Sequence, residues 1–238
     1  IGSPPQTPDL EGFEYLDDTS NSPSGLLGAI KLTGQYGRLR YGILSAIEED
    51  SFSRGLILGK AVDISQKGRD FHALRILHET RKSGGRKGVG WISTLVSHPQ
   101  EDASVHGADG HFLSRSARWK IDGQVLISDK GSSNGFGSYV DFRYTPSKGF
   151  RHDLALDYYD SNFDVNDFGF LRRNNTYGTN YKFTFTNSEL KNLKSSRIEF
   201  GARLEFNGDD LAVRKGIYSN MRFEFIKNHA FKANLAYL

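Results

Sequence analysis

Cysteine is absent from the 238 residues of the chain, and methionine occurs once. The absence of cysteine excludes a disulfide framework, a thiolate metal site and a cysteine nucleophile. No stretch approaches the roughly 18 consecutive apolar residues that a membrane-spanning helix needs. Lysine and arginine are interleaved with acidic residues, and the formal net charge is only +3. The basic stripe that would indicate a nucleic-acid partner is therefore missing.

The mean hydropathy of −0.52 is typical of a water-soluble protein. A membrane β-barrel, however, turns only every second residue toward lipid, so its mean hydropathy also stays polar. The chain begins at Ile1 without an initiator methionine. We expect it to be a fragment or a processed product of a longer protein.

The first residues differ in composition from the remainder. Four prolines fall within Ile1–Ser24, together with several Asp, Asn and Ser residues. This composition predicts an irregular lead-in over residues 1–25. The remaining residues, 26–238, are predicted to form one β-barrel domain.

Apolar and polar residues alternate along most of residues 26–238. Near the start, apolar residues occupy one parity (Ile30, Leu32, Tyr36) and polar residues the other (Lys31, Thr33, Gln35). Alternation of this kind indicates β-strands with one apolar and one polar face. We count about twelve such strands, several near the roughly 9–11 residues that cross a bilayer at a tilt.

The turns preserve these faces. A two-residue turn at Gly37-Arg38 would pair Tyr36 with Leu39, and the apolar set switches from even to odd numbers there, as that pairing requires. A five-residue turn at 145–149 keeps the parity, and the apolar set stays even. Near the end of the chain, pairing of Phe225 with Phe231 would place Glu224 opposite Lys232.

Short turns also alternate along the chain with longer connections, which are expected at Glu48–Arg69 and Asp160–Asn174. Outer-membrane barrels have this arrangement, with short turns at one end and long loops at the other. The sequence therefore predicts an all-β protein, an antiparallel up-and-down transmembrane β-barrel of which this chain is a part. A soluble sandwich also alternates, but its apolar face is a close-packed core. Here that face is rich in Phe and Tyr near strand ends. The opposite face is predicted to line a polar lumen, through Arg40, Asp141, Arg143, Asp153, Asp157, Arg197, Glu199, Arg203, Glu205, Arg222, Glu224 and Lys232.

Three segments, Ala29–Gly34, Gly107–Phe112 and Asn162–Asn174, resemble motifs of one large bacterial family, the C-terminal domain of unknown function 5916. The first is Ala29–Gly34, with Lys31, Thr33 and Gly34, and the second is Gly107–Phe112, with Gly107, Asp109 and Gly110. The third is the family's "DFNPEVGFVRR-D" signature at Asn162–Asn174, with Phe163, Gly169, Phe170, Arg172 and Arg173. Ile1-Gly2, with Pro5-Gln6, resembles the end of a preceding "RRIG" motif. The resemblance implies an outer-membrane barrel that commonly follows a family 9-like carbohydrate-binding module.

This sequence departs from the family pattern in two places. The Asn-Pro of the signature reads Asp164-Val165-Asn166, and the carbohydrate-binding module is missing. The first departure leaves the role of that proline open here.

Other groups of polar residues do not match the pattern of a catalytic or metal-binding site. The segment from Asp160 has the alternation of a calcium loop but lacks the Gly and Glu that an EF-hand requires. His106 and His111 are five residues apart on a predicted strand and so point to opposite faces. Residues 132–137 are interpreted as a turn or loop. Asp141, Asp153 and Asp157 share a face, and pairing with Arg143 and Arg151 is favoured over glycoside hydrolysis. No catalytic, metal or cofactor site is predicted.

The leading hypothesis is a non-enzymatic protein of the bacterial outer membrane, in contact with lipid and lipopolysaccharide. It would serve transport, export or surface display of the carbohydrate-binding module, through which carbohydrate would be a partner. The alternative is a soluble carbohydrate-binding or carbohydrate-active β-sheet protein. An interaction scaffold for a secretion or surface complex is a third possibility.

Overall fold

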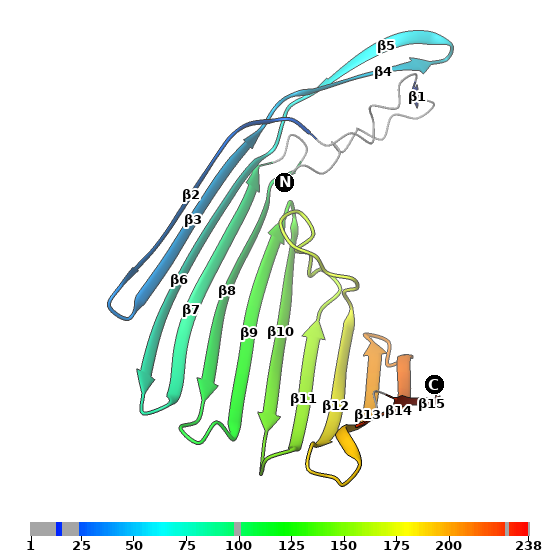
Figure 1. The fold of residues 1–238 in the computed structure, drawn as a ribbon. Helices are drawn as coiled ribbons and strands as arrows, with labels where there is room; N and C mark the ends of the chain where they lie inside the picture. The colour runs from blue at the N-terminus through cyan, green and yellow to red at the C-terminus, as the bar shows by residue number, and fades with distance from the viewer. Residues whose placement is uncertain (1–12, 16–23, 98–100, 227–228, 238) are drawn as a thin grey trace.

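The computed structural model describes residues 13–15, 24–97, 101–226 and 229–237, and these contain strands and no helix. No helix in this part of the chain is therefore long and apolar enough to cross a bilayer. Twelve strands form one antiparallel sheet, curved as Figure 1 shows. They are β2 (Leu26–Tyr36), β3 (Leu39–Glu48), β6 (Asp70–Lys82), β7 (Gly85–Ser97), β8 (Ala103–Leu113), β9 (Trp119–Lys130), β10 (Ser133–Tyr144), β11 (Phe150–Tyr159), β12 (Thr176–Asn187), β13 (Leu193–Asn207), β14 (Ala212–Phe225) and β15 (Ala230–Tyr237).

The order of these strands follows the chain. Each strand pairs with its sequence neighbours, except that β3 pairs with β6 across an inserted hairpin. The predicted all-β, antiparallel, up-and-down arrangement of about twelve strands is confirmed. Within the described residues β2 and β15 each pair on one side only, so the sheet is open and no closed barrel is formed.

The inserted hairpin corrects one expectation. The segment Glu48–Arg69, predicted as a loop, contains β4 (Ser51–Ile57) and β5 (Lys60–Gln66), which pair with each other. Leu58 and Gly59 have φ values of 50° and 77°, as a two-residue hairpin turn requires. This hairpin forms a second, three-stranded sheet with β1 (Phe13–Tyr15). The rest of the expected lead-in, residues 1–12 and 16–23, lies outside the described residues, as do the motif residues near Ile1.

The turns fix the register of the large sheet. Gly37 has a φ of 58°, and Tyr36 pairs with Leu39 as predicted. Residues 145–149 separate β10 from β11 and the parity is kept as predicted, but the last pair is Tyr144 with His152, and Arg143 lies directly opposite Asp153. The predicted pairing of Phe225 with Phe231 is wrong, because Phe223 is opposite Phe231. Lys232 therefore faces Arg222 and not Glu224. Residues 227–228 of this turn lie outside the described part.

The register gives the sheet two faces, which we call the apolar face and the polar face. Large side chains on the apolar face are exposed, among them Ile43, Ile76, Trp91, Val125, Val140, Leu156, Phe200 and Leu235. The buried apolar residues of the sheet, Ala46, Phe71, Val96 and Ala103, all point to the polar face. Phe168, from the segment between β11 and β12, packs against Ala46, Phe71 and Val96, so this segment covers part of the polar face.

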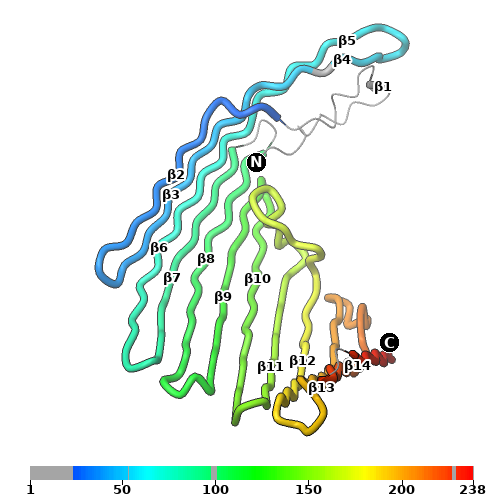
Figure 2. The backbone as a smooth tube through the Cα atoms, in the orientation of Figure 1, coloured from blue at the N-terminus to red at the C-terminus, as the bar shows by residue number. Residues whose placement is uncertain are grey.

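The two longest connections leave the same end of the sheet (Figure 2). One carries the β4–β5 hairpin, and the other is residues 160–175 between β11 and β12. We call residues 160–175 the signature loop, because it contains the third motif. The opposite end has only the turns of two to five residues that follow β2, β6, β8, β10, β12 and β14.

Candidate functional site

The predicted lumen residues share one face of the sheet. The register places Arg40, Asp141, Arg143, Asp153, Asp157, Arg197, Glu199, Arg203, Glu205, Arg222, Glu224 and Lys232 on the polar face. Their assignment to a lumen stays a prediction. What the structure adds is that all twelve lie on the same face of the sheet, on β3, β10, β11, β13, β14 and β15.

Ion pairs along single strands neutralise much of this surface. Arg197 and Glu199 are 2.7 Å apart, Arg203 and Glu205 are 3.2 Å apart, and Arg222 pairs with Glu224 in the same way. In each pair the two residues are separated by one position, so both point to the polar face. The charges therefore pair within the surface and do not form a field of one sign.

A second cluster surrounds Glu79, whose side chain is only 5% exposed. Its carboxylate lies 2.8 Å from Arg81, 3.3 Å from Arg40 and 3.6 Å from Arg86, and the His111 ring is 3.1 Å away. A buried carboxylate needs such partners to offset the loss of hydration. The cluster joins β3, β6, β7 and β8 at the short-turn end of the polar face.

The three carboxylates considered for hydrolysis have different partners. Asp153 is 2.5 Å from Arg143 and 2.9 Å from Arg151, as the pairing hypothesis expects for the first contact. The expected Asp141–Arg151 contact is replaced by Arg151–Asp153. Asp141 and Asp157 form no ion pair within the described residues.

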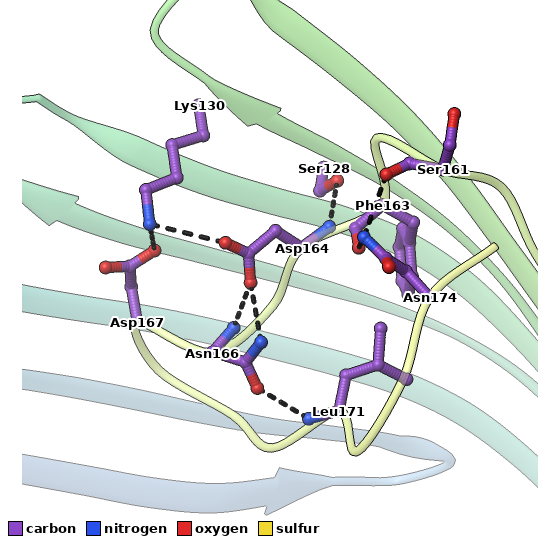
Figure 3. A network of polar contacts seen from close by, with 9 residues as sticks. All are labelled: Ser128, Lys130, Ser161, Phe163, Asp164, Asn166, Asp167, Leu171 and Asn174. Carbon is purple, nitrogen blue, oxygen red and sulfur yellow. Dashed lines mark hydrogen bonds and ion pairs between the residues drawn. The ribbon is translucent and has the colours of Figure 1, made fainter.

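The signature loop folds over the polar face and is held by polar contacts, as Figure 3 shows. The N–H of Asp164 donates to the Ser128 hydroxyl over 3.0 Å, and the Asn174 amide donates to the carbonyl oxygens of Ser161 and Phe163. Asn166 accepts from the N–H of Leu171 over 2.7 Å. These bonds satisfy the loop backbone and fix its shape.

Lys130 supplies the cation of this loop. Its ammonium lies 3.3 Å from Asp164 and 2.9 Å from Asp167 (Figure 3). Burial alone would raise the pKa of Asp164, but the N–H of Asn166 and the Lys130 ammonium together hold that pKa below its usual value. The acidic residues that resemble a calcium loop thus already have a positive partner, and no group of three metal-ligating side chains occurs among the described residues.

Apolar contacts at two points complete the docking. The Phe163 side chain is 1% exposed and stacks on Tyr159, with ring centroids 5.5 Å apart. It lies over two glycines of β10, where a Cβ on Gly135 would come within 2.3 Å of the Phe163 backbone and one on Gly137 within 2.6 Å of its ring. Phe168 packs against Phe71, with centroids 5.7 Å apart. The loop therefore reaches from β11 across to β6.

The other motif residues have separate positions. On β2, Lys31 and Thr33 point to the polar face, and Gly34 lies beneath the Tyr41 ring. On β8, Gly107 is packed against Leu126, Asp109 forms a 2.7 Å ion pair with Arg75, and Gly110 is on the apolar face. In the loop, the N–H of Gly169 donates to the Val165 carbonyl, while Phe170, Arg172 and Arg173 are exposed. The structure does not bring the three motifs into one cluster.

Several docking residues were not predicted, namely Ser128, Lys130, Gly135, Gly137, Phe71 and Phe168. Residues 132–137, interpreted as a turn or loop, lie mostly in β10 from Ser133 onward, and only the turn at 131–132 is confirmed. The sequence signal that could have indicated this docking site is the pair Gly135 and Gly137, which are separated by one residue. It places two residues without side chains on one face of a strand, as a close backbone approach requires.

The apolar face carries aromatic residues in two rows. Toward the loop end, Phe136 contacts Tyr158, and Tyr177 stacks on Phe206. Toward the short-turn end lie Trp119, Tyr144, Phe150 and Phe185. The Trp119 and Tyr144 rings stack with centroids 3.9 Å apart, and the Phe150 and Phe185 rings are tilted with centroids 4.9 Å apart. On each of β10, β11 and β12, the residue of one row and the residue of the other are eight positions apart. On this face of these three strands, no charged residue lies between the two rows.

Comparison with known proteins identifies the family. The model of the family described as a domain of unknown function (DUF5916) matches residues 2–238. No curated protein and no solved structure matches the chain. The motifs on β2, on β8 and in the signature loop agree with this match, and the chain belongs to the DUF5916 family.

Proposed function

We propose that this chain is the membrane-spanning sheet of a bacterial outer-membrane β-barrel and has no enzymatic activity. Its apolar face would contact lipid and lipopolysaccharide, and its polar face would line a lumen of mixed charge. Transport, export or surface display of a carbohydrate-binding module would be its role. The observation that carries the proposal is the exposed apolar face bounded by two aromatic rows.

The dimensions of that face fit a bilayer. Eight residues rise about 27 Å along an antiparallel strand. A strand tilt of about 40° reduces this to a height of about 21 Å, close to the apolar band of roughly 25 Å in outer-membrane barrels, which aromatic girdles also flank. In a soluble domain this face would need a covering layer, and no described element covers it.

Three histidines on the apolar face have hydrogen-bond partners, which also supports the proposal, although the Ser219 hydroxyl on this face has none among the described residues. His72 is 3.0 Å from the Ser45 hydroxyl, His106 is 2.8 Å from that of Ser93, and His152 is 2.8 Å from that of Tyr181. Each histidine is bonded to a neighbouring strand. Such pairing lowers the cost of placing a polar ring where water is absent.

Fractionation of cells that express the natural full-length protein tests this proposal. We expect the protein in the outer-membrane fraction, soluble only with detergent, with a band that shifts on a gel after heating. Recovery in the periplasmic fraction without detergent, together with no heat-dependent shift, would refute the membrane assignment and favour the soluble alternative.

A further inference from the structure

The charges of the polar face are sorted into rows across β9–β12. One row, which we call the acid-rich row, consists of Asp122, Asp141, Ala155 and Asn180, each opposite the next in the register. The adjacent base-rich row consists of Lys120, Arg143, Asp153 and Lys182. The rows are two residues apart along each strand, which corresponds to about 7 Å.

A pocket of about 230 Å³ lies where the two rows meet, and the side chains of both rows line it. The small side chain of Ala155 leaves room for this pocket. It stands between Asp141 and Asn180 in the acid-rich row, and its methyl group leaves the gap that a longer side chain would fill.

Most of the charges around the pocket already have partners. Lys120 pairs with Asp122. Asp153 is held by Arg143 at 2.5 Å and by Arg151 at 2.9 Å.

One acidic and one basic side chain of the pocket have no partner of opposite charge in the described part of the chain. Asp141 and Lys182 form no ion pair within the described residues. Asn180 adds a third unsatisfied group, because its Oδ1 atom is buried and accepts no hydrogen bond. The pocket therefore offers an anion and a cation, and the Asn180 oxygen is enclosed in its wall.

We propose that this pocket binds a small zwitterionic, peptide-like molecule. Its ammonium group would pair with Asp141 and its carboxylate with Lys182. Asp141 on β10 and Lys182 on β12 are two strand spacings and two residues apart, which places their Cα atoms about 12 Å from each other. An extended dipeptide spans about 7 Å, at roughly 3.3–3.6 Å per residue, and the two side chains would reach toward its ends. The inference rests on the proposed function, since it names the class of solute that a lumen lined by this face would hold.

Calorimetric titration of the full chain, purified in detergent, with alanyl-alanine tests the inference. We expect saturable binding that weakens at least tenfold in Asp141→Asn and in Lys182→Gln, because each change removes one charge-assisted hydrogen bond. Ala155→Leu should also abolish binding, by filling the pocket while keeping every charge. Lys232→Gln, on the same face at β15, is the matched control and should bind like the unchanged protein.

Two analogues make the test specific. N-acetyl-alanyl-alanine lacks the ammonium and alanyl-alanine amide lacks the carboxylate, and each should bind at least tenfold more weakly than the dipeptide. No binding, or binding that Asp141→Asn and Lys182→Gln leave unchanged, would overturn the inference. Binding by a protein that fractionates as soluble would keep the pocket and refute only the membrane assignment.

Discussion

Gly135→Ala should release the signature loop from the sheet. The new Cβ would lie 2.3 Å from the N and Cα atoms of Phe163, and both are backbone atoms that cannot rotate away. The strand itself tolerates the change, since the added methyl points away from its hydrogen-bonded edges. Undocking exposes the Phe163 ring, whose burial contributes about 2–3 kcal/mol.

That loss can be measured by limited trypsin digestion at Arg172 and Arg173, which lie in the loop. If opening is fast relative to cleavage, the rate follows the population of the open form. A loss of about 2–3 kcal/mol then raises the rate about 30- to 150-fold. Gly110→Ala is the control, because a Cβ there meets nothing nearer than 3.8 Å. Equal cleavage rates in Gly135→Ala and the unchanged protein would refute the docking contact.

Three further changes probe other parts of the molecule. The lowered pKa of Asp164 means that its contact with Lys130 stabilises the loop above the unfolded pKa of about 4 and is lost as pH falls through the folded value. Hydrogen exchange of residues 160–175 should therefore show less protection as pH falls from 6 through the acid range, and equal corrected protection throughout would contradict this. Val140→Arg should lower the free energy of unfolding in lipid bilayers by about 2–4 kcal/mol, whereas Tyr139→Arg, on the polar face, should lower it little. Urea titration in vesicles measures both values, and equal losses would count against lipid contact. Glu79→Gln leaves the neighbouring arginines without a counter-charge and should lower the free energy of unfolding by about 1–3 kcal/mol in the same titration. An unchanged urea midpoint would show that the cluster does not stabilise the protein.

Local rules predicted much of the sheet. The positive φ of Gly37 and the switch of parity after it are properties of a few adjacent residues, so the register there could be derived. The same reasoning predicted a diagonal contact between Arg143 and Asp153, whereas the two residues lie directly opposite each other. The pairing of Phe225 failed because the turn after β14 shifts the register by two residues, and a shift of two preserves parity.

Longer-range features could not be derived in this way. The β4–β5 hairpin lies apart from the large sheet, and its turn at Leu58-Gly59 lacks the Asn or Asp that usually marks such a turn. The docking of the signature loop joins Phe168 to Phe71, which are 97 positions apart, and no local pattern links them. The motif resemblance marked the loop but did not indicate which strands it covers.

The most direct test of the membrane proposal uses the cysteine-free sequence. Single substitutions Leu156→Cys and Asp157→Cys place a thiol on the apolar and on the polar face of β11. In outer-membrane vesicles that contain the full-length protein, a membrane-impermeant maleimide should label Asp157→Cys and leave Leu156→Cys unlabelled until the protein is unfolded. Rapid labelling of Leu156→Cys in intact vesicles would contradict contact between the apolar face and lipid.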